Sequence, residues 1–214
     1  INDFEELFII ASSWNDVLGK LIDDPPIPKW YVKRSPESIV GLAIYKGDIQ
    51  SQATPSKKFE TKNNKDWYFM DLTDANDEKT SNSLNKEPGI GYAAFLKVGE
   101  KISLNEELWA QSTHLLSGPA SITVVKSMAT EAEDYIEYGI NQKSDAIELR
   151  FNSFSDRGTE FIDGLLYMIG DKTEDGKSYY AYSENNEYIK PVLAIDAKWV
   201  DAVIGLYDNP PIKK

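Results

Sequence analysis

The chain has 214 residues, a formal net charge of −12, one histidine (His114) and no cysteine. Zinc, copper and iron–sulfur sites need several imidazoles or thiolates, so this composition excludes nearly all of them. The negative charge disfavours nucleic acid and anionic membrane surfaces as partners. Aromatic residues make up 12% of the chain, which argues against disorder. We therefore expect a folded protein that has no cofactor, does not bind nucleic acid and does not insert into a membrane.

Residues 3–22 are predicted to form an amphipathic helix, ended by the acidic and proline-rich run 23–26. Its apolar side chains recur at spacings of three and four, namely Phe4, Leu7, Phe8, Ala11, Trp14, Leu18, Leu21 and Ile22. The favoured interpretation is that this stripe faces the core. The alternative is a helix that docks on a partner or a membrane surface, but Lys20 is the only base on the polar face, which is unlike a lipid-binding helix.

The first half of the remaining chain predicts strands at 39–45, 66–72 and 90–98, separated by polar segments. The segment 50–65 is polar and locally basic, and its pattern predicts no helix or strand. The segment 73–88 holds only Ala75 and Leu84 as apolar residues. We interpret it as a long loop inside one globular domain that spans 1–214, with a domain boundary there as the alternative.

The second half predicts two helices and five strands. A capping-box pattern over Ser103–Glu106 opens a helix that reaches Leu116, and a second such pattern at Thr130 opens a short helix that stops at Gly139. The predicted strands are 120–126, 145–152, 165–169, 177–182 and 188–195, with a hairpin turn at Asp175-Gly176. In 145–152, apolar Ile147, Leu149 and Phe151 alternate with polar neighbours.

The C-terminal segment fits either a helix or a strand, and we favour a helix capped by Asp196 and stopped at Asn209-Pro210. The order of elements predicts an α+β fold. It would have a largely antiparallel sheet, an N-terminal amphipathic helix and two or three further helices.

Three familiar site motifs fail on inspection. A Walker A loop needs four residues between its glycines, whereas Gly170 and Gly176 enclose five, three of them acidic. The same segment starts like an EF-hand at Asp171 but has Tyr182 where a glutamate is needed. The chain has no Gly-x-Ser-x-Gly nucleophile elbow whose serine His114 could activate, so we interpret His114 as a structural side chain.

Acidic residues offer weak calcium candidates. Asp71, Asp74 and Asp77 lie close together in a polar stretch, and carboxylate oxygens are the ligands that calcium prefers. The acidic turn at 171–175 has the same character. The favoured alternative for both segments is a solvated acidic loop without an ion.

Aromatic residues give the candidate binding surface, formed by Trp67, Tyr68, Tyr179, Tyr180 and Tyr182. Neighbouring residues in a strand point to opposite faces, so we expect Tyr180 and Tyr182 on one face and Tyr179 on the other. We expect at least two of these three tyrosines to be solvent-exposed, where rings with a polar tip suit a sugar or protein surface. The competing interpretation is that helices cover both faces of the sheet.

These observations lead to three functional hypotheses. The leading one is a non-enzymatic binding protein that recognises a glycan or protein partner through exposed aromatic and acidic residues, with a secreted or cell-surface location favoured over a cytoplasmic one. The second is a cytosolic acidic inhibitor or immunity-type protein that blocks a basic target. The third is a carboxylate-dependent hydrolase, for which the sequence singles out no pair among its 35 acids.

Overall fold

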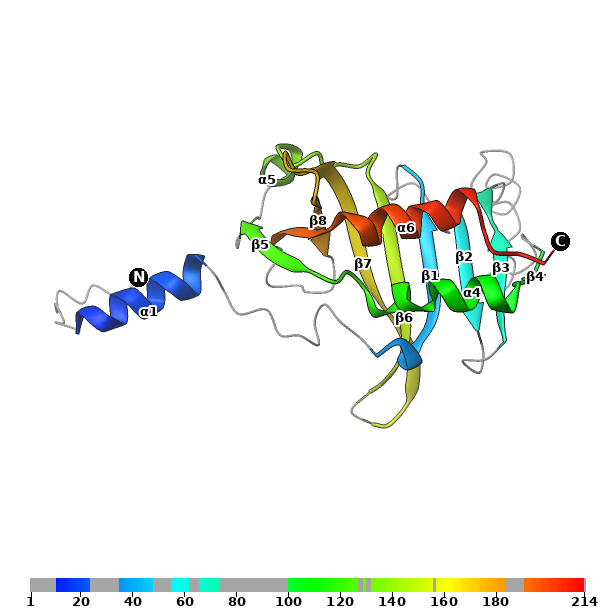
Figure 1. Ribbon diagram of the computed structural model, residues 1–214. Helices are drawn as coiled ribbons and strands as arrows, with labels where there is room; N and C mark the ends of the chain where they lie inside the picture. Colours follow the sequence, from blue (N-terminus) through cyan, green and yellow to red (C-terminus); the bar gives the residue numbers. More distant parts are fainter. Residues whose placement is uncertain are drawn as a thin grey trace, which may run out of the picture.

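A computed structural model describes residues 11–23, 35–47, 55–61, 66–73, 100–126, 129, 132–155, 157–183 and 191–213 (Figure 1). Within these ranges, nine strands form one antiparallel sheet in the order β4-β3-β2-β1-β6-β7-β8-β9-β5. The strands are β1 (Ile39–Tyr45), β2 (Lys57–Thr61), β3 (Trp67–Asp71), β4 (Ile102–Ser103), β5 (Ile122–Lys126), β6 (Asp145–Phe154), β7 (Glu160–Lys172), β8 (Ser178–Ser183) and β9 (Val192–Asp196). This arrangement confirms the predicted α+β fold.

The hairpin of β6 and β7 lies in the middle of the sheet and pairs over ten residues, from Asp145 opposite Ile169 to Phe154 opposite Glu160. The predicted alternation in β6 is confirmed, since Ile147, Leu149 and Phe151 are buried. Side chains alternate between the two faces of the sheet along every strand, and residues that pair on neighbouring strands lie on the same face. We call the face that carries Ile147 and Leu149 the first face, and the opposite face, which carries Glu148 and Arg150, the second face.

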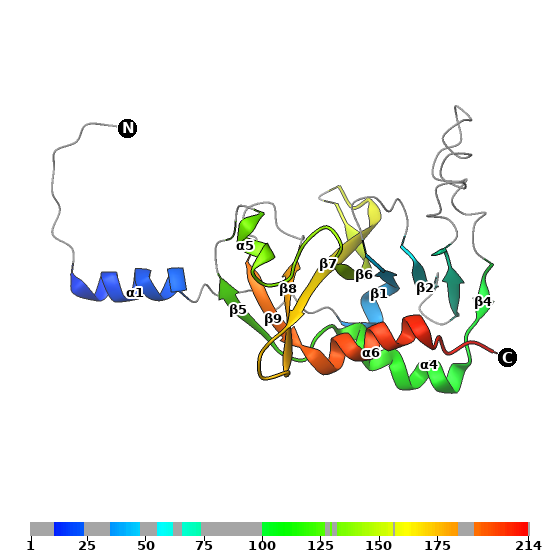
Figure 2. The ribbon, with the colours of Figure 1, turned by 90° about the horizontal axis from the view of Figure 1, so that it is seen from above.

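Two layers of helix cover the sheet unequally (Figure 2). The first face packs against α4 (Glu106–Ser112), the 3-10 turn η4 (Thr113–Ser117) and α6 (Ala197–Asp208). The much shorter α5 (Glu133–Ile136) lies on the second face, near β8. A further 3-10 turn, η1 (Pro36–Ser38), leads into β1. The main apolar core therefore lies between the first face and the three helical segments.

Caps explain where the helices begin. Asp196 accepts a hydrogen bond from the backbone of Lys198 at the start of α6, so the helical choice for the C-terminal segment is confirmed. The capping residue of α4 is Asn105, whose side chain accepts from the backbone of Leu108. The expected cap at Ser103 is wrong because Ser103 belongs to β4 and pairs with β3.

The N-terminal helix does not pack as expected. Its described part, α1 (Ser12–Asp23), stands apart from the sheet in Figure 1, and Trp14 and Leu18 of the predicted stripe are 58% and 46% exposed. The core-facing interpretation is therefore wrong for these residues, while 3–10 lie outside the described residues. Periodicity shows that a helix has an apolar face but not what that face contacts. No helix in the described ranges is long and apolar enough to cross a membrane.

Two further expectations need correction. The polar segment 50–65 contains β2, which escaped prediction because Phe59 is its only large apolar residue. The helix expected from Thr130 to Gly139 is only the single turn of α5, and Thr130 itself lies outside the described residues. The strand expected at 90–98 and almost all of the polar stretch 73–88 also lie outside them.

Candidate functional site

A row of charged and tyrosine side chains crosses the second face. The register places Arg150 of β6 opposite Gly41 of β1, Gly41 opposite Glu60 of β2, and Glu60 opposite Tyr68 of β3. Because Gly41 has no side chain, nothing from β1 separates Arg150 from Glu60 at this point. A Cβ at Gly41 would lie 3.2 Å from the Cβ of Arg150. The row is thus built by strand register and a glycine in the middle strand.

Arg150 is held by Glu148, two residues earlier in β6. Its Nε and Nη2 donate to Oε2 of Glu148 at 3.0 and 2.9 Å, and the hydroxyl of Tyr45 donates to the same oxygen at 2.8 Å. A Cβ at Gly164, on the neighbouring strand, would lie 2.5 Å from Oε1 of Glu148. Glycine at this position therefore leaves room for the carboxylate that fixes the guanidinium.

Glu60 is fully engaged at the other end of the row. Lys58 donates to its Oε1 at 3.0 Å and Tyr68 donates to its Oε2 at 2.8 Å. Burial alone would raise the pKa of Glu60, but Lys58, Tyr68 and Arg150 outweigh it and hold the pKa below its ordinary value. Nη1 of Arg150 lies 3.8 Å from Oε1 of Glu60, which is an ion-pair distance beyond hydrogen-bond length.

The tyrosines of this row act as donors. Burial raises the pKa of Tyr45, and the neighbouring Glu148 raises it further. Burial, together with the hydrogen bond to Glu60, also raises the pKa of Tyr68. Both phenols stay protonated at neutral pH. Burial would lower the pKa of Arg150, but Glu148 more than reverses this, so the guanidinium stays charged.

A concave site of about 560 Å³ opens beside this row, and we call it the Arg150 pocket. Its volume falls within the range of small-molecule sites, roughly 300–1,000 Å³. Lining residues come from β1, β2, β3, β6 and β7 and from Lys101 just before β4: Val40, Glu60, Thr61, Tyr68, Lys101, Arg150, Asn152, Glu160, Phe161 and Ile162. The ammonium of Lys101 lies 4.3 Å from the ring centroid of Tyr68. The pocket thus combines a polar floor with an apolar wall.

The apolar wall belongs to the end of the β6–β7 hairpin, which extends below the rest of the sheet in Figure 1. Phe154, Phe161 and Ile162 are 67%, 44% and 65% exposed there. Single exposed apolar residues are ordinary, but three large ones at one hairpin end beside a pocket make this end a candidate interaction surface.

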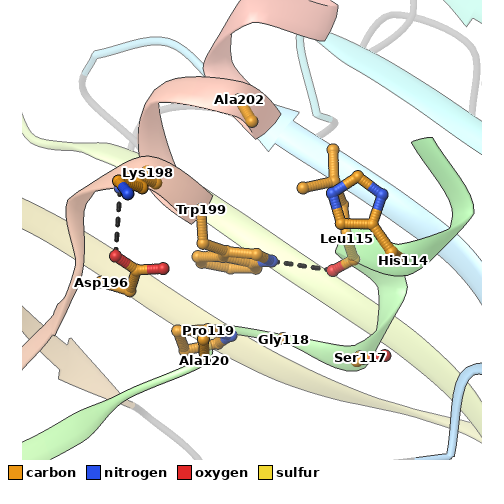
Figure 3. Close-up of a pocket in the computed structure, with 10 residues that line it drawn as sticks. All are labelled: His114, Leu115, Ser117, Gly118, Pro119, Ala120, Asp196, Lys198, Trp199 and Ala202. Atoms are coloured by element: carbon orange, nitrogen blue, oxygen red, sulfur yellow. Dashed lines mark hydrogen bonds between the residues drawn. The ribbon is translucent and has the colours of Figure 1, made fainter. Parts of the chain in front are cut away.

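A smaller pocket of about 260 Å³, the Trp199 pocket, lies between η4 and the start of α6 (Figure 3). The indole Nε1 of Trp199 donates to the backbone oxygen of Leu115 at 2.8 Å, which fixes the ring. His114 lines the rim, and its Nδ1 lies 2.8 Å from the backbone oxygen of Gln111. His114 is thus hydrogen-bonded to the preceding helical turn. The site has room for a small apolar group.

A third concave region, the aspartate cleft of about 700 Å³, is lined by four aspartates: Asp145, Asp171, Asp201 and Asp208. Asp145 pairs with Lys46 at 2.7 Å and accepts from the backbone of Gly47. Asp201 accepts from Tyr179 at 2.8 Å and pairs with Lys172 at 3.1 Å. Two of the four carboxylates therefore tie the chain together, which weakens this cleft as the acid–base pair of a hydrolase.

The three tyrosines of β8 are not exposed as expected. Tyr182 is 8% exposed and packs against Tyr135 at a centroid distance of 5.0 Å, while Tyr180 is half-buried and packs against Tyr138 at 4.9 Å. Tyr179 is half-buried on the first face. The expected split between the two faces is confirmed, but the exposure is wrong because α5 and its flanks cover one face and α6 covers the other.

The two remaining aromatic candidates separate. Trp67 packs into the first-face core against Trp109, with ring centroids 5.0 Å apart. Tyr68 points to the second face and lines the Arg150 pocket. Of the five aromatic candidates, the structure therefore brings one to this pocket.

Among the calcium candidates, Asp71 is described. Its Oδ1 accepts from the backbone and hydroxyl of Thr73 at 3.1 and 2.6 Å, and its Oδ2 pairs with Lys57 at 3.5 Å. Asp74 and Asp77 lie outside the described residues. Within the described ranges, no group of three or more histidine, aspartate or glutamate side chains is arranged to hold a metal ion.

Apart from Tyr68, the residues that line the Arg150 pocket were not predicted from the sequence. The alternation of β6 already placed Glu148, Arg150 and Asn152 on one polar face, which is the pattern that could have pointed to them. Glu60 was missed because β2 was not predicted.

Comparisons of the chain with family models, curated proteins and solved structures gave no match. The functional assignment therefore rests on the geometry.

Proposed function

We propose that this is a non-enzymatic binding protein whose ligand occupies the Arg150 pocket, with the end of the β6–β7 hairpin as its apolar wall. The observation that carries this proposal is the pairing of two features. The floor is a fixed network around Arg150, and the wall exposes Phe161 and Ile162. Binding sites typically combine such an apolar lining with a few fixed polar groups.

The chemistry of the floor favours binding over catalysis. Tyr45 and Tyr68 have raised pKa values and are committed as donors to Glu148 and Glu60, so neither is prepared to accept a proton from a substrate. Glu60 has a lowered pKa, whereas a carboxyl that acts as a general acid at neutral pH needs a raised one. A network of this kind holds donors in place without reacting.

A second candidate is an acidic inhibitor of a basic target. The net charge of −12 and the four carboxylates of the aspartate cleft favour this candidate, because negative charges gathered on one surface attract a positively charged partner. This candidate predicts contact at Asp171 and Asp208 rather than at the Arg150 pocket.

A panel of glycans, peptides of both charges and small organic acids, titrated into ¹⁵N-labelled protein, tests the proposal. Ligands that bind should shift the backbone amides of Arg150 and Ile162. The substitution Ile162→Asp should abolish these shifts, whereas Ile136→Asp on α5, where the isoleucine is equally exposed at 60%, should leave them unchanged. A panel without any binder, or binding that persists in Ile162→Asp, would contradict the proposal. Shifts centred on Asp171 and Asp208 with basic peptides would support the inhibitor instead.

A further inference from the structure

We propose that the Arg150 pocket takes an amphiphilic carboxylate, with its anionic head between Arg150 and Lys101 and its alkyl or aryl tail on the hairpin wall. This inference rests on the proposed function and names the class of ligand. It follows from which polar groups in the pocket are already satisfied and which still have donors to offer.

The acceptors near the pocket are largely engaged. Oε1 of Glu60 accepts from Lys58, and Oε2 of Glu60 accepts from Tyr68. Oε2 of Glu148 accepts from Tyr45 and Arg150. The charges of Glu60, Glu160, Lys101 and Arg150 sum to zero, so net charge does not decide which ligand is preferred. The side chain of Glu160 is exposed and has no hydrogen bond or ion pair among the described residues, so it is the one pocket carboxylate open to a ligand that brings only donors.

The donors are less engaged. Nε and Nη2 of Arg150 point to Glu148, while Nη1 makes only the 3.8 Å ion pair with Glu60 among the described residues. Within the same described part of the chain, the ammonium of Lys101 contacts the ring of Tyr68 and forms no ion pair. A guanidinium and an ammonium that keep free N–H groups in one pocket suit a carboxylate, which accepts charge-assisted hydrogen bonds.

The apolar wall of the pocket determines the chemistry of the rest of the ligand. Val40, Phe161 and Ile162 line the pocket together, and the two hairpin residues are exposed enough to be covered by a bound chain. Burying their apolar surface under an alkyl or aryl tail would add binding free energy that a small carboxylate lacks. A single ligand therefore needs both an anionic head and an apolar tail.

Octanoate is the probe, and three compounds are matched to it. Octanol lacks the charge, octylammonium has the opposite charge, and acetate lacks the tail. Calorimetric titration should give saturable binding of octanoate that is roughly tenfold or more tighter than that of octanol, octylammonium or acetate. Lys101→Met should weaken octanoate binding by about tenfold. Lys198→Met, which changes a lysine of the Trp199 pocket, is the control and should leave the affinity unchanged.

Octanol that binds as tightly as octanoate, or a Lys101→Met variant with unchanged affinity, would overturn this inference. If a glycan or peptide shifts Ile162 while octanoate does not bind, the inference fails and the proposed function stands. If octanoate and every other compound leave the amides of the Arg150 pocket unchanged, both fail. Lys101 is exposed and contacts one ring, so its replacement leaves the fold intact and the outcome readable.

Discussion

Replacing Glu148 by leucine should reveal how strongly the row on the second face holds the sheet together. The change removes one carboxylate oxygen that accepts hydrogen bonds from Tyr45 and from two nitrogens of Arg150. It leaves a guanidinium whose side chain is only 19% exposed without its main partner. We expect a loss of about 3 kcal/mol in the free energy of unfolding, at the low end of the range for a buried pair because both side chains keep some contact with water.

Equilibrium unfolding in urea, followed by tryptophan fluorescence, measures this loss. The double variant Glu148→Leu/Arg150→Met removes both charges and should cost about 1 kcal/mol or less, since a buried pair replaced by apolar groups of similar size is close to neutral. The double variant should therefore be more stable than Glu148→Leu alone. The single variant Arg150→Met completes the comparison. If its loss and that of Glu148→Leu simply add in the double variant, Glu148 and Arg150 act independently and the reasoning is refuted.

Four further outcomes are expected from the same unfolding assay. Gly205→Ala should stabilise the protein by about 0.5–1 kcal/mol, because a Cβ at this helical position meets nothing within 4 Å; destabilisation would contradict this. Asp196→Ala should cost about 1 kcal/mol by removing the cap on Lys198, and Asp196→Asn should restore most of it. Tyr182→Ala should cost about 3–5 kcal/mol, because the ring is buried; a loss under about 1 kcal/mol would mean that it faces water. The pKa of Glu60 is lower in the folded state than its unfolded value of about 4.3, so its contribution is present above that pH and is lost as the pH falls through the folded value. Between about pH 7 and pH 3, Glu60→Gln should lose less stability than the unchanged protein, and an equal loss would contradict the assigned pKa.

Much of the fold follows from local pattern. The alternation in β6 and the cap at Asp196 each depend on residues within one element, and both predictions are confirmed. β2 could not be found this way, because KKFET carries one large apolar residue and its strand character comes from pairing with β1 and β3. Pairing between distant segments is information that periodicity does not contain.

The candidate site as a whole could not be predicted for the same reason, although Tyr68 and the polar side of β6 are visible in the sequence. Arg150 and Glu60 are separated by 90 positions in the chain and meet only because the register aligns them on either side of Gly41. The exposure of the β8 tyrosines was predicted wrongly because their neighbours in the sequence are polar. In the fold, α5, which comes from another part of the chain, covers Tyr182. Burial of an aromatic residue is decided by what packs over it, which a single strand does not show.

A crystallographic fragment screen tests the central claim most directly, because it samples every surface of the protein without assuming a ligand class. We expect bound fragments to gather in the Arg150 pocket, with acidic groups facing Arg150 and Lys101 and apolar rings against Phe161 and Ile162. Fragments that gather instead in the Trp199 pocket or the aspartate cleft, and leave the Arg150 pocket empty, would contradict it.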